Sequence, residues 1–514
     1  MALAAALFDC VLLSAGDGIP QFVTSDTLLP MHMAWDTHGY PAAWSSYQWP
    51  RIPSLIPDMA YFHGAERLGL GWRGALLGFI PVMLGLLALG MGAIIGRFHR
   101  YGLVSGAARA ALAIAALLLL LTGLVAATGL GPWSALLLIL LPVTHGSGFI
   151  LSLFAAGTAD AALQGDRRAF WATILMCLVG AFSDLLFVFA FVIPLAAASR
   201  VAVVRPIIER GGLRGLFTVT TCRRLFTQNS TLVYSALAAC LIGWASQRML
   251  NLQPLGTYLL KSPSAALPQM LGDFRYTPWT GLVIVGSAAL IVKATATLRQ
   301  NLATEATFHH SASFLIVFGA VATIMGFGLL AVTYVDPNSW RYGMTSIWWP
   351  LTIGLALRPA IIWTGQRSAP QSALTYGFGG ALLLAATVLV ILRPPPLLAW
   401  HSPLETCLTN ERARLGLRHG LAPYWLARAT EASSNWKLQV RPIADDGSSL
   451  PWGDDATLMA RDANVPGTPA WFNFIVVDQS TQRAEIMQRF GVPAARKACA
   501  GAELWAYDHR LLPT

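Results

Sequence analysis

The chain has 514 residues, of which 55% are hydrophobic and only 12% are charged. Because soluble proteins carry about 25% charged residues to cover their surfaces, this composition excludes an ordinary soluble enzyme. The net charge of +10 lies in the hydrophobic part, since the residues from Pro394 onward are neutral, and no nucleic-acid-binding motif occurs. We therefore interpret the charge as a signal of membrane topology.

The first apolar block, Met1–Ser14, lacks the basic segment and the cleavage site of a signal peptide, so we interpret it as the first membrane helix. The loop that follows, residues 15–72, holds five acids and two bases. Basic residues favour the cytoplasmic side of a membrane, so an acidic loop is expected outside.

Long apolar blocks predict further membrane helices, because about 20 apolar residues in a helix span the hydrocarbon core. Such blocks lie at 74–96, 108–128, 279–297, 312–334 and 373–393. Two other regions, 131–158 and 169–197, contain polar breaks at Thr144-His145-Gly146 and Ser183-Asp184. We expect an α-helical polytopic membrane protein with about eleven transmembrane helices, one of these two regions being split.

The charges of the loops predict where the two parts of the chain lie. The basic loop 198–229 is expected in the cytoplasm, and the spans that follow place the C-terminal part outside. We therefore divide the chain into a transmembrane domain, residues 1–395, and an extracytoplasmic domain, residues 396–514.

The C-terminal part has the alternating pattern of a small α/β domain with three strands and two helices. Helices are predicted at 409–432 and 481–491, the second with Thr481 as its cap and Gly491 as its stop, and strands at 436–443, 470–478 and 502–509.

The six cysteines do not form the pattern of a disulfide-rich scaffold. Cys10, Cys177 and Cys240 fall in apolar blocks, where cysteine is usually a small buried hydrophobe. Cys407 and Cys499 lie in the C-terminal domain, and an oxidising compartment favours a disulfide between them. Two separate buried thiols are the alternative.

The external loop contains acids among aromatic residues, where a carboxylate is costly unless it is solvated or used. Asp26 precedes an apolar pattern typical of a helix on the membrane surface, where it can act as a general base or simply cap that helix. Asp58 precedes the second span and is either a second catalytic acid or a charge that favours a helix N-terminus.

Other polar residues are candidates for substrate binding. In the loop these are Asp36, Arg51, His63 and Glu66. Their spacing matches no known metal site, so no cofactor is expected, although a divalent metal stays open. His145 and Asp184 are ionisable groups inside apolar blocks, where they either line a proton or substrate path or serve helix packing.

The stretch SDTLLPMHMAWDTH…QWPRIPSLIPDMAYF resembles the GT-C class of membrane glycosyltransferases and is similar to bacterial membrane proteins grouped with that class. The acidic first external loop, the many helices and the external C-terminal domain extend the resemblance over residues 1–395. In that class the early acid of the first loop is the catalytic base, which implies this role for Asp26. Many members have a second adjacent acid, whereas here Asp36 and Asp58 lie farther along the chain.

The resemblance implies transfer of a sugar from a polyprenyl-phosphate carrier to a lipid or glycan acceptor, with inversion. The leaving lipid phosphate needs a cation nearby, for which Arg275, Arg341 and Lys261 are candidates, with Tyr342 beside Arg341. Each can equally be an interfacial residue that reaches the membrane surface. The expected location is a bacterial inner membrane, with the C-terminal domain in the periplasm.

Two other functions fit the sequence. A transporter or flippase of a lipid-linked substrate is consistent with the broken helices around Asp184. A non-catalytic assembly protein of the envelope is consistent with a membrane part that carries an external domain. Internal inverted symmetry would favour the transporter, and the hydropathy pattern has none.

Overall fold

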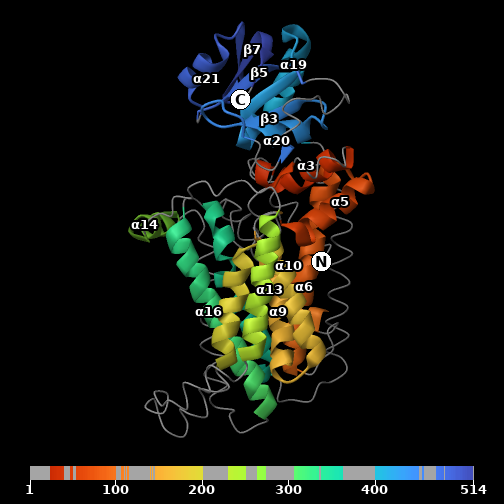
Figure 1. The fold of residues 1–514 in the computed structure, drawn as a ribbon, viewed down its shortest axis with the longest axis vertical. Helices are drawn as coiled ribbons and strands as arrows, with labels where there is room; N and C mark the ends of the chain where they lie inside the picture. Colours follow the sequence, from red (N-terminus) through yellow and green to blue (C-terminus); the bar gives the residue numbers. More distant parts are fainter. Residues whose placement is uncertain are drawn as a thin grey trace. The chain divides into compact units, whose positions relative to one another are not determined.

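The computed structural model describes part of the hydrophobic region and most of the C-terminal domain (Figure 1). The described residues are 23–39, 47–49, 54–99, 106–108, 110–111, 113–114, 139, 142, 145–200, 230–249, 263–273, 306–334, 337–362, 400–450, 454–455, 470–479 and 481–512. The chain divides into two compact units. The first contains the hydrophobic helices after Phe79, and the second contains the first loop and the C-terminal domain.

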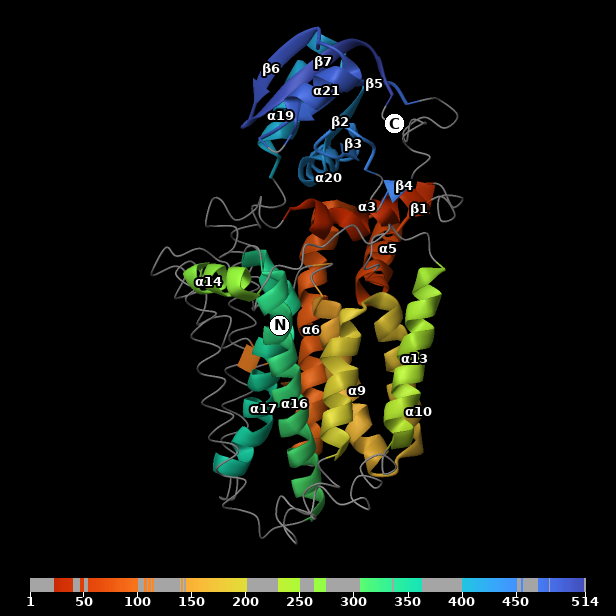
Figure 2. The ribbon, with the colours of Figure 1, turned by 60° about the vertical axis from the view of Figure 1, so that its left-hand side comes forward.

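The described elements of the first unit are almost entirely helical, and their long helices run side by side (Figure 2). They are α6 (Gly71–His99, which begins in the second unit), α9 (Gly146–Leu163), α10 (Arg167–Ser183), the π-helix η2 (Val188–Val192), α13 (Ser230–Arg248), α14 (Pro263–Asp273), α16 (Ala306–Thr333), the 3₁₀ helix η4 (Pro337–Gly343) and α17 (Met344–Ile362).

Three described helices are long and apolar enough to cross a membrane: Gly71–Gly96, Gly146–Leu163 and Ser313–Thr333. The first and last of these confirm the helices predicted at 74–96 and 312–334. The expected number of about eleven crossings is not confirmed. The blocks 279–297 and 373–393 and most of 108–128 lie outside the described residues, as do Met1–Ser14 and the basic loop 201–229.

Both polar breaks that the sequence shows are real interruptions of the helices. His145 precedes α9 with a left-handed backbone (φ 65°), a conformation that costs free energy in any residue with a side chain. At the second break, α10 ends at Ser183 and Asp184 is extended (φ −151°, ψ 115°) before the chain turns into η2. The two breaks are 39 residues apart in the chain and lie close in space because α9 and α10 form a helical hairpin.

The second unit includes the helices of the first loop. These are α3 (Ser25–Gly39), the π-helix η1 (Leu55–Met59) and α5 (Ala60–Arg67). A short strand of the loop, β1 (Tyr47–Gln48), pairs antiparallel with β4 (Asp454–Asp455) of the C-terminal domain. The sequence-based division assigned this loop to the transmembrane domain, but the structure groups it with the C-terminal domain, because α3 and β1 bond to that domain.

The C-terminal domain is a five-stranded mixed sheet with helices on both faces. Its strands, in the order β3-β2-β5-β7-β6, are β2 (His419–Pro423), β3 (Gln439–Ile443), β5 (Phe472–Val477), β6 (Ala495–Cys499) and β7 (Ala502–Leu511). The pairs β3/β2 and β2/β5 are parallel, and β5/β7 and β7/β6 are antiparallel. Helices α19 (Pro403–Leu415) and α20 (Tyr424–Ser433) cover one face, and α21 (Arg483–Phe490) covers the other.

This confirms the α/β class of the domain but corrects three local predictions. The helix expected at 409–432 is interrupted by β2, because Gly416 ends α19 in a left-handed conformation and the next residues enter the sheet. Strand β6 was not predicted, since its residues are mostly exposed and lack an apolar pattern. Thr481 bonds to Asp478 in a turn and leaves Gln482 as the N-cap, whereas Gly491 does end α21.

The structure contains the predicted bond between Cys407 and Cys499, with their Cα atoms 5.7 Å apart. It joins the start of the domain, on α19, to the end of β6, across 92 residues. Cys177 and Cys240 are buried free thiols, as the apolar blocks around them predict.

Candidate functional sites

Asp26 lies in the first turn of α3, at the surface between this helix and the C-terminal domain. Its Oδ1 accepts a hydrogen bond of 2.8 Å from the hydroxyl of Tyr424, the first residue of α20. The preceding residue, Ser25, donates its hydroxyl to the backbone carbonyl of Tyr424. Asp26 keeps part of its surface exposed, whereas Asp36 and Asp58 are buried. Of these three aspartates, Asp26 is therefore the one that a substrate can reach directly.

Five ionisable side chains form a buried charge cluster where α3 packs on the C-terminal domain. They are His32 and Asp36 of α3, Arg428 and Glu431 of α20, and Arg441 of β3, and each is no more than 2% exposed. This buried charge cluster joins parts of the chain that are about 400 residues apart.

His32 lies at the centre of the buried charge cluster. Its Nδ1 lies 3.1 Å from Asp36 Oδ2, one helical turn away, and its Nε2 lies 2.8 Å from Glu431 Oε2. The guanidinium of Arg441 completes the arrangement, 3.8 Å from Asp36 and 3.9 Å from Glu431. A stacked pair, Trp35 on Trp436 with centroids 5.0 Å apart, packs beside it.

The environment of the cluster changes the acidity of two of its groups. Burial alone disfavours a charged imidazole and Arg428 opposes it, but the carboxylates of Asp36 and Glu431 outweigh them and hold the pKa of His32 above its usual value. For Asp36, burial favours the neutral acid, but His32 and Arg441 outweigh it and lower the pKa of that carboxyl. Both directions favour the charged pair.

The remaining described loop candidates lie on η1 and α5, which pack on α3. Asp58 is buried within η1, at 1% exposure, and His63 and Glu66 are half-buried on α5. Arg51 lies outside the described residues. Asp58 is thus enclosed within the second unit, whereas the carboxylate of Asp26 is partly exposed.

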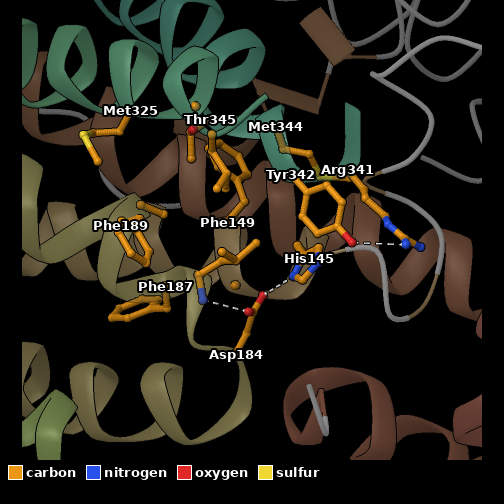
Figure 3. Close-up of a pocket in the computed structure, with 15 residues that line it drawn as sticks. His145, Phe149, Asp184, Phe187, Phe189, Met325, Arg341, Tyr342, Met344 and Thr345 are labelled. Atoms are coloured by element: carbon orange, nitrogen blue, oxygen red, sulfur yellow. Dashed lines mark hydrogen bonds and ion pairs between the residues drawn. The ribbon is translucent and has the colours of Figure 1, made fainter. Parts of the chain in front are cut away.

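The first unit contains a pocket at the two helix breaks (Figure 3). His145 Nδ1 lies 2.9 Å from Asp184 Oδ2, and Asp184 Oδ1 accepts a bond of 2.9 Å from the backbone N–H of Leu186. Both side chains are buried, at 6% and 1% exposure. The two isolated polar residues of the sequence are therefore partners, and the carboxylate fixes the orientation of the imidazole.

The sequence His145-Gly146-Ser147-Gly148 allows this close approach. A Cβ at Gly148 would lie 2.8 Å from Asp184 Oδ2, and one at Gly146 would lie 2.6 Å from the carbonyl oxygen of Ile139. Glycine at both positions thus lets α9 begin directly beside the carboxylate.

Arg341 and Tyr342 of η4 lie at the polar side of the same pocket, as Figure 3 shows. The ring of Tyr342 lies 5.0 Å from that of His145, and its hydroxyl is 3.2 Å from an Arg341 nitrogen. The opposite side of the pocket is apolar. That side is lined by Phe149, Phe187, Phe189, Met325 and Leu329.

The pocket thus has one polar side and one apolar side, as a site for an amphiphilic molecule would have. Its polar side combines the Arg341 guanidinium, the Tyr342 phenol, the imidazole of His145 with its partner carboxylate Asp184, and the N-terminus of α9. The guanidinium and the helix N-terminus favour an anion, and the carboxylate of Asp184 is taken up by His145 and the Leu186 N–H. Among the described residues, no group of three or more metal-ligating side chains could hold a metal ion. The described groups therefore suit an anionic headgroup with an apolar chain.

Several sequence-based candidates come together and others do not. His145, Asp184, Arg341 and Tyr342 converge on the pocket, while Arg275 and Lys261 lie outside the described residues. The sequence missed Arg428, Glu431 and Arg441, because charges in a soluble domain are ordinarily solvated. Their one local signal is that they lie in segments otherwise composed of buried residues.

Comparisons with protein-family models, curated proteins and solved structures find no match for this chain.

Proposed function

We propose that the protein is a membrane glycosyltransferase that moves a sugar from a polyprenyl-phosphate carrier to an envelope acceptor, with Asp26 as the base. The observation that supports it most is the pocket of the first unit, in which Arg341, Tyr342 and His145 face an apolar lining. A guanidinium beside a helix N-terminus suits a phosphate, and the aromatic lining suits a prenyl chain.

The proposed reaction needs a base and a stabilised leaving group. Asp26 takes the proton of an acceptor hydroxyl while that oxygen bonds to the anomeric carbon, and the bond from this carbon to the phosphate oxygen breaks. The lipid phosphate leaves with the bonding electrons, and configuration inverts. Arg341, in the pocket of the first unit, is the proposed binding group for the lipid phosphate. The partial exposure of Asp26 and the Tyr424 hydroxyl on its Oδ1 support this role for its carboxylate.

The base is tested with Asp26→Asn, assayed with radiolabelled polyprenyl-phosphate hexoses and pentoses in membranes that contain the full chain. General base catalysis is worth about 10²–10⁴ in rate, so transfer should fall by that factor while the protein stays folded. The matched control is Asp166→Asn, because Asp166 also lies at a helix start and caps α10 through Arg168 N–H and Ala169 N–H. In the structure Thr24, not Asp26, bonds the first-turn N–H of Thr27. Normal transfer by Asp26→Asn would therefore show that Asp26 serves only the contact of α3 with Tyr424.

The donor site is tested with Arg341→Gln, with Arg67→Gln, an exposed cation of α5, as the control. A hydrogen bond to a charged group is worth about 1.5–3 kcal/mol, which corresponds to roughly a 10- to 100-fold weaker affinity for the lipid phosphate. Equal affinity of both variants for a short-chain prenyl phosphate would overturn the assignment of the pocket.

A transporter or flippase of a lipid-linked substrate is the second candidate, favoured by the two helix breaks that meet at His145 and Asp184. The two functions predict different products in proteoliposomes. A flippase moves an intact fluorescent lipid phosphate sugar between leaflets and does not need Asp26, whereas the transferase releases the sugar to an acceptor.

A further inference from the structure

We propose that protonated His32 is the latch that docks α3 on the C-terminal domain, so that the C-terminal domain holds the N-terminus of α3 below a threshold pH and releases it above. The proposal concerns docking within the second unit and does not require sugar transfer. Its consequence for Asp26, which lies on the same helix, rests on the proposed function.

The geometry favours the imidazolium. Each nitrogen of His32 faces a carboxylate oxygen, Nδ1 toward Asp36 at 3.1 Å and Nε2 toward Glu431 at 2.8 Å. A neutral imidazole has one N–H and one lone pair, so one of these contacts would set a lone pair against a carboxylate. The doubly protonated ring donates to Glu431 and forms an ion pair with Asp36.

The other charges at His32 come from every element packed on it. Asp36 lies on the same helix, Glu431 and Arg428 on α20, and Arg441 on β3, with its Nη1 3.1 Å from His32 Nε2. That close Arg441 contact taken alone suggests a neutral acceptor nitrogen. The contact with Glu431 is shorter, at 2.8 Å, and Asp36 adds a second carboxylate at the other nitrogen. These two anions favour the charged ring, although Arg428 and Arg441 oppose it.

Docking through His32 also fixes the start of α3. Asp26 accepts the Tyr424 hydroxyl, and Ser25 donates to the Tyr424 carbonyl, so α3 contacts α20 at both its first and its third turn. When the His32 contacts are lost, the bonds of Ser25 and Asp26 to Tyr424 still join the first turn of α3 to α20. His32 is thus a positioning residue.

The pH dependence of docking follows from the direction in which the pKa of His32 is changed. Because docking raises the pKa of His32, the stabilisation is complete below its usual value, about 6.5, and is lost as the pH rises through the higher value of the docked state. Asp36 acts in the opposite sense. Its lowered pKa means that its contribution is complete above about 4 and is lost at more acidic pH.

The test measures hydrogen exchange of the full chain in nanodiscs between pH 6 and pH 9. The protection factors of the α3 and α20 amides should fall over this range. The expected fall is roughly tenfold for each unit by which docking raises the pKa of His32. His32→Gln should give α3 a low protection factor at pH 6 that no longer changes with pH. The matched control is His401→Gln, an exposed histidine 3.3 Å from Glu405 at the same four-residue spacing, which should leave the profile unchanged.

Asp36→Asn distinguishes a latch from a merely structural contact. It removes one of the two anions that favour the imidazolium, so the midpoint of the loss should move to lower pH by about one unit. A pH-independent protection of α3 in the wild type, or an unmoved midpoint in Asp36→Asn, would overturn the proposal. Either result leaves the transfer assay of Asp26→Asn to be judged separately.

Discussion

The two units each contain a buried histidine beside an aspartate, and the surroundings of the pairs differ. His32 and Asp36 are one turn apart on α3 and are enclosed by Arg428, Glu431 and Arg441. His145 and Asp184 are 39 residues apart, join two helix breaks and line a pocket with Arg341 and Tyr342.

The comparison shows how neighbours decide what a histidine–aspartate pair does. In the second unit, ions from two other elements surround the pair, so its charges serve to hold elements together. In the first unit, the carboxylate is held by the imidazole and by one backbone N–H, and the imidazole borders an open space. We call His32–Asp36 the closed pair, because other ions enclose it, and His145–Asp184 the open pair, because it borders the pocket. The closed pair suits docking and the open pair suits ligand binding, and the following substitutions test both.

The largest effect is expected for Arg441→Met. This guanidinium is fully buried between Asp36 and Glu431, and breaking a buried ion cluster by removing one partner costs about 3–5 kcal/mol. The free energy of unfolding of the C-terminal domain, measured by pulse proteolysis in urea, should fall by that amount. Arg412→Met, at an exposed position of α19, should change it by less than about 0.5 kcal/mol. Similar values for both variants would mean that the cluster is solvated.

Asp184→Ala should have the next largest effect, because it leaves the imidazole of His145 and the N–H of Leu186 without their acceptor. Leaving a buried donor unsatisfied costs about 1–3 kcal/mol, which thermal unfolding of the purified full chain would detect. Asp160→Ala is a suitable comparison, since that buried carboxylate on α9 bonds to the part-exposed Gln164 and does not line the pocket. A smaller loss for Asp184→Ala than for Asp160→Ala would contradict the account of the open pair.

Gly148→Ala tests the open pair without a change of charge. The new Cβ would lie 2.8 Å from Asp184 Oδ2, and overpacking costs about 1–3 kcal/mol, here near the lower end because the carboxylate can rotate away. The rotation would lengthen the bond to His145 and weaken binding of a prenyl phosphate. Gly157→Ala on the same helix meets its nearest atom only at 3.8 Å and should leave stability and binding unchanged.

The smallest effect is expected for Thr173→Val, which removes the 2.8 Å bond between Thr173 and Thr158 in the α9–α10 hairpin. Bonds between membrane helices average about 0.6 kcal/mol, so the unfolding temperature should hardly change. A loss as large as that of Asp184→Ala would mean that hairpin packing, and not the His145–Asp184 contact, dominates this region.

The local patterns of the sequence predicted most single elements correctly. The apolar blocks at 74–96 and 312–334 are helices, the alternating segment at 436–443 contains β3, and both polar breaks interrupt their helices. These features depend on the spacing of neighbouring residues, which backbone geometry alone converts into helix or strand. Strand β2 was not predicted because its five residues are buried on both faces and α20 begins directly after them.

What the sequence determined by itself is the hydrophobic class of the chain, the α/β class of its C-terminal domain, and a short set of candidate residues that includes Asp26, His145 and Asp184. Only the tertiary structure decided which of them are partners. His32 meets Glu431 across 399 residues and His145 meets Asp184 across 39. Such contacts depend on how helices and sheets pack, and no local pattern encodes them, because the free energy that favours each contact arises only when both segments are already folded and buried.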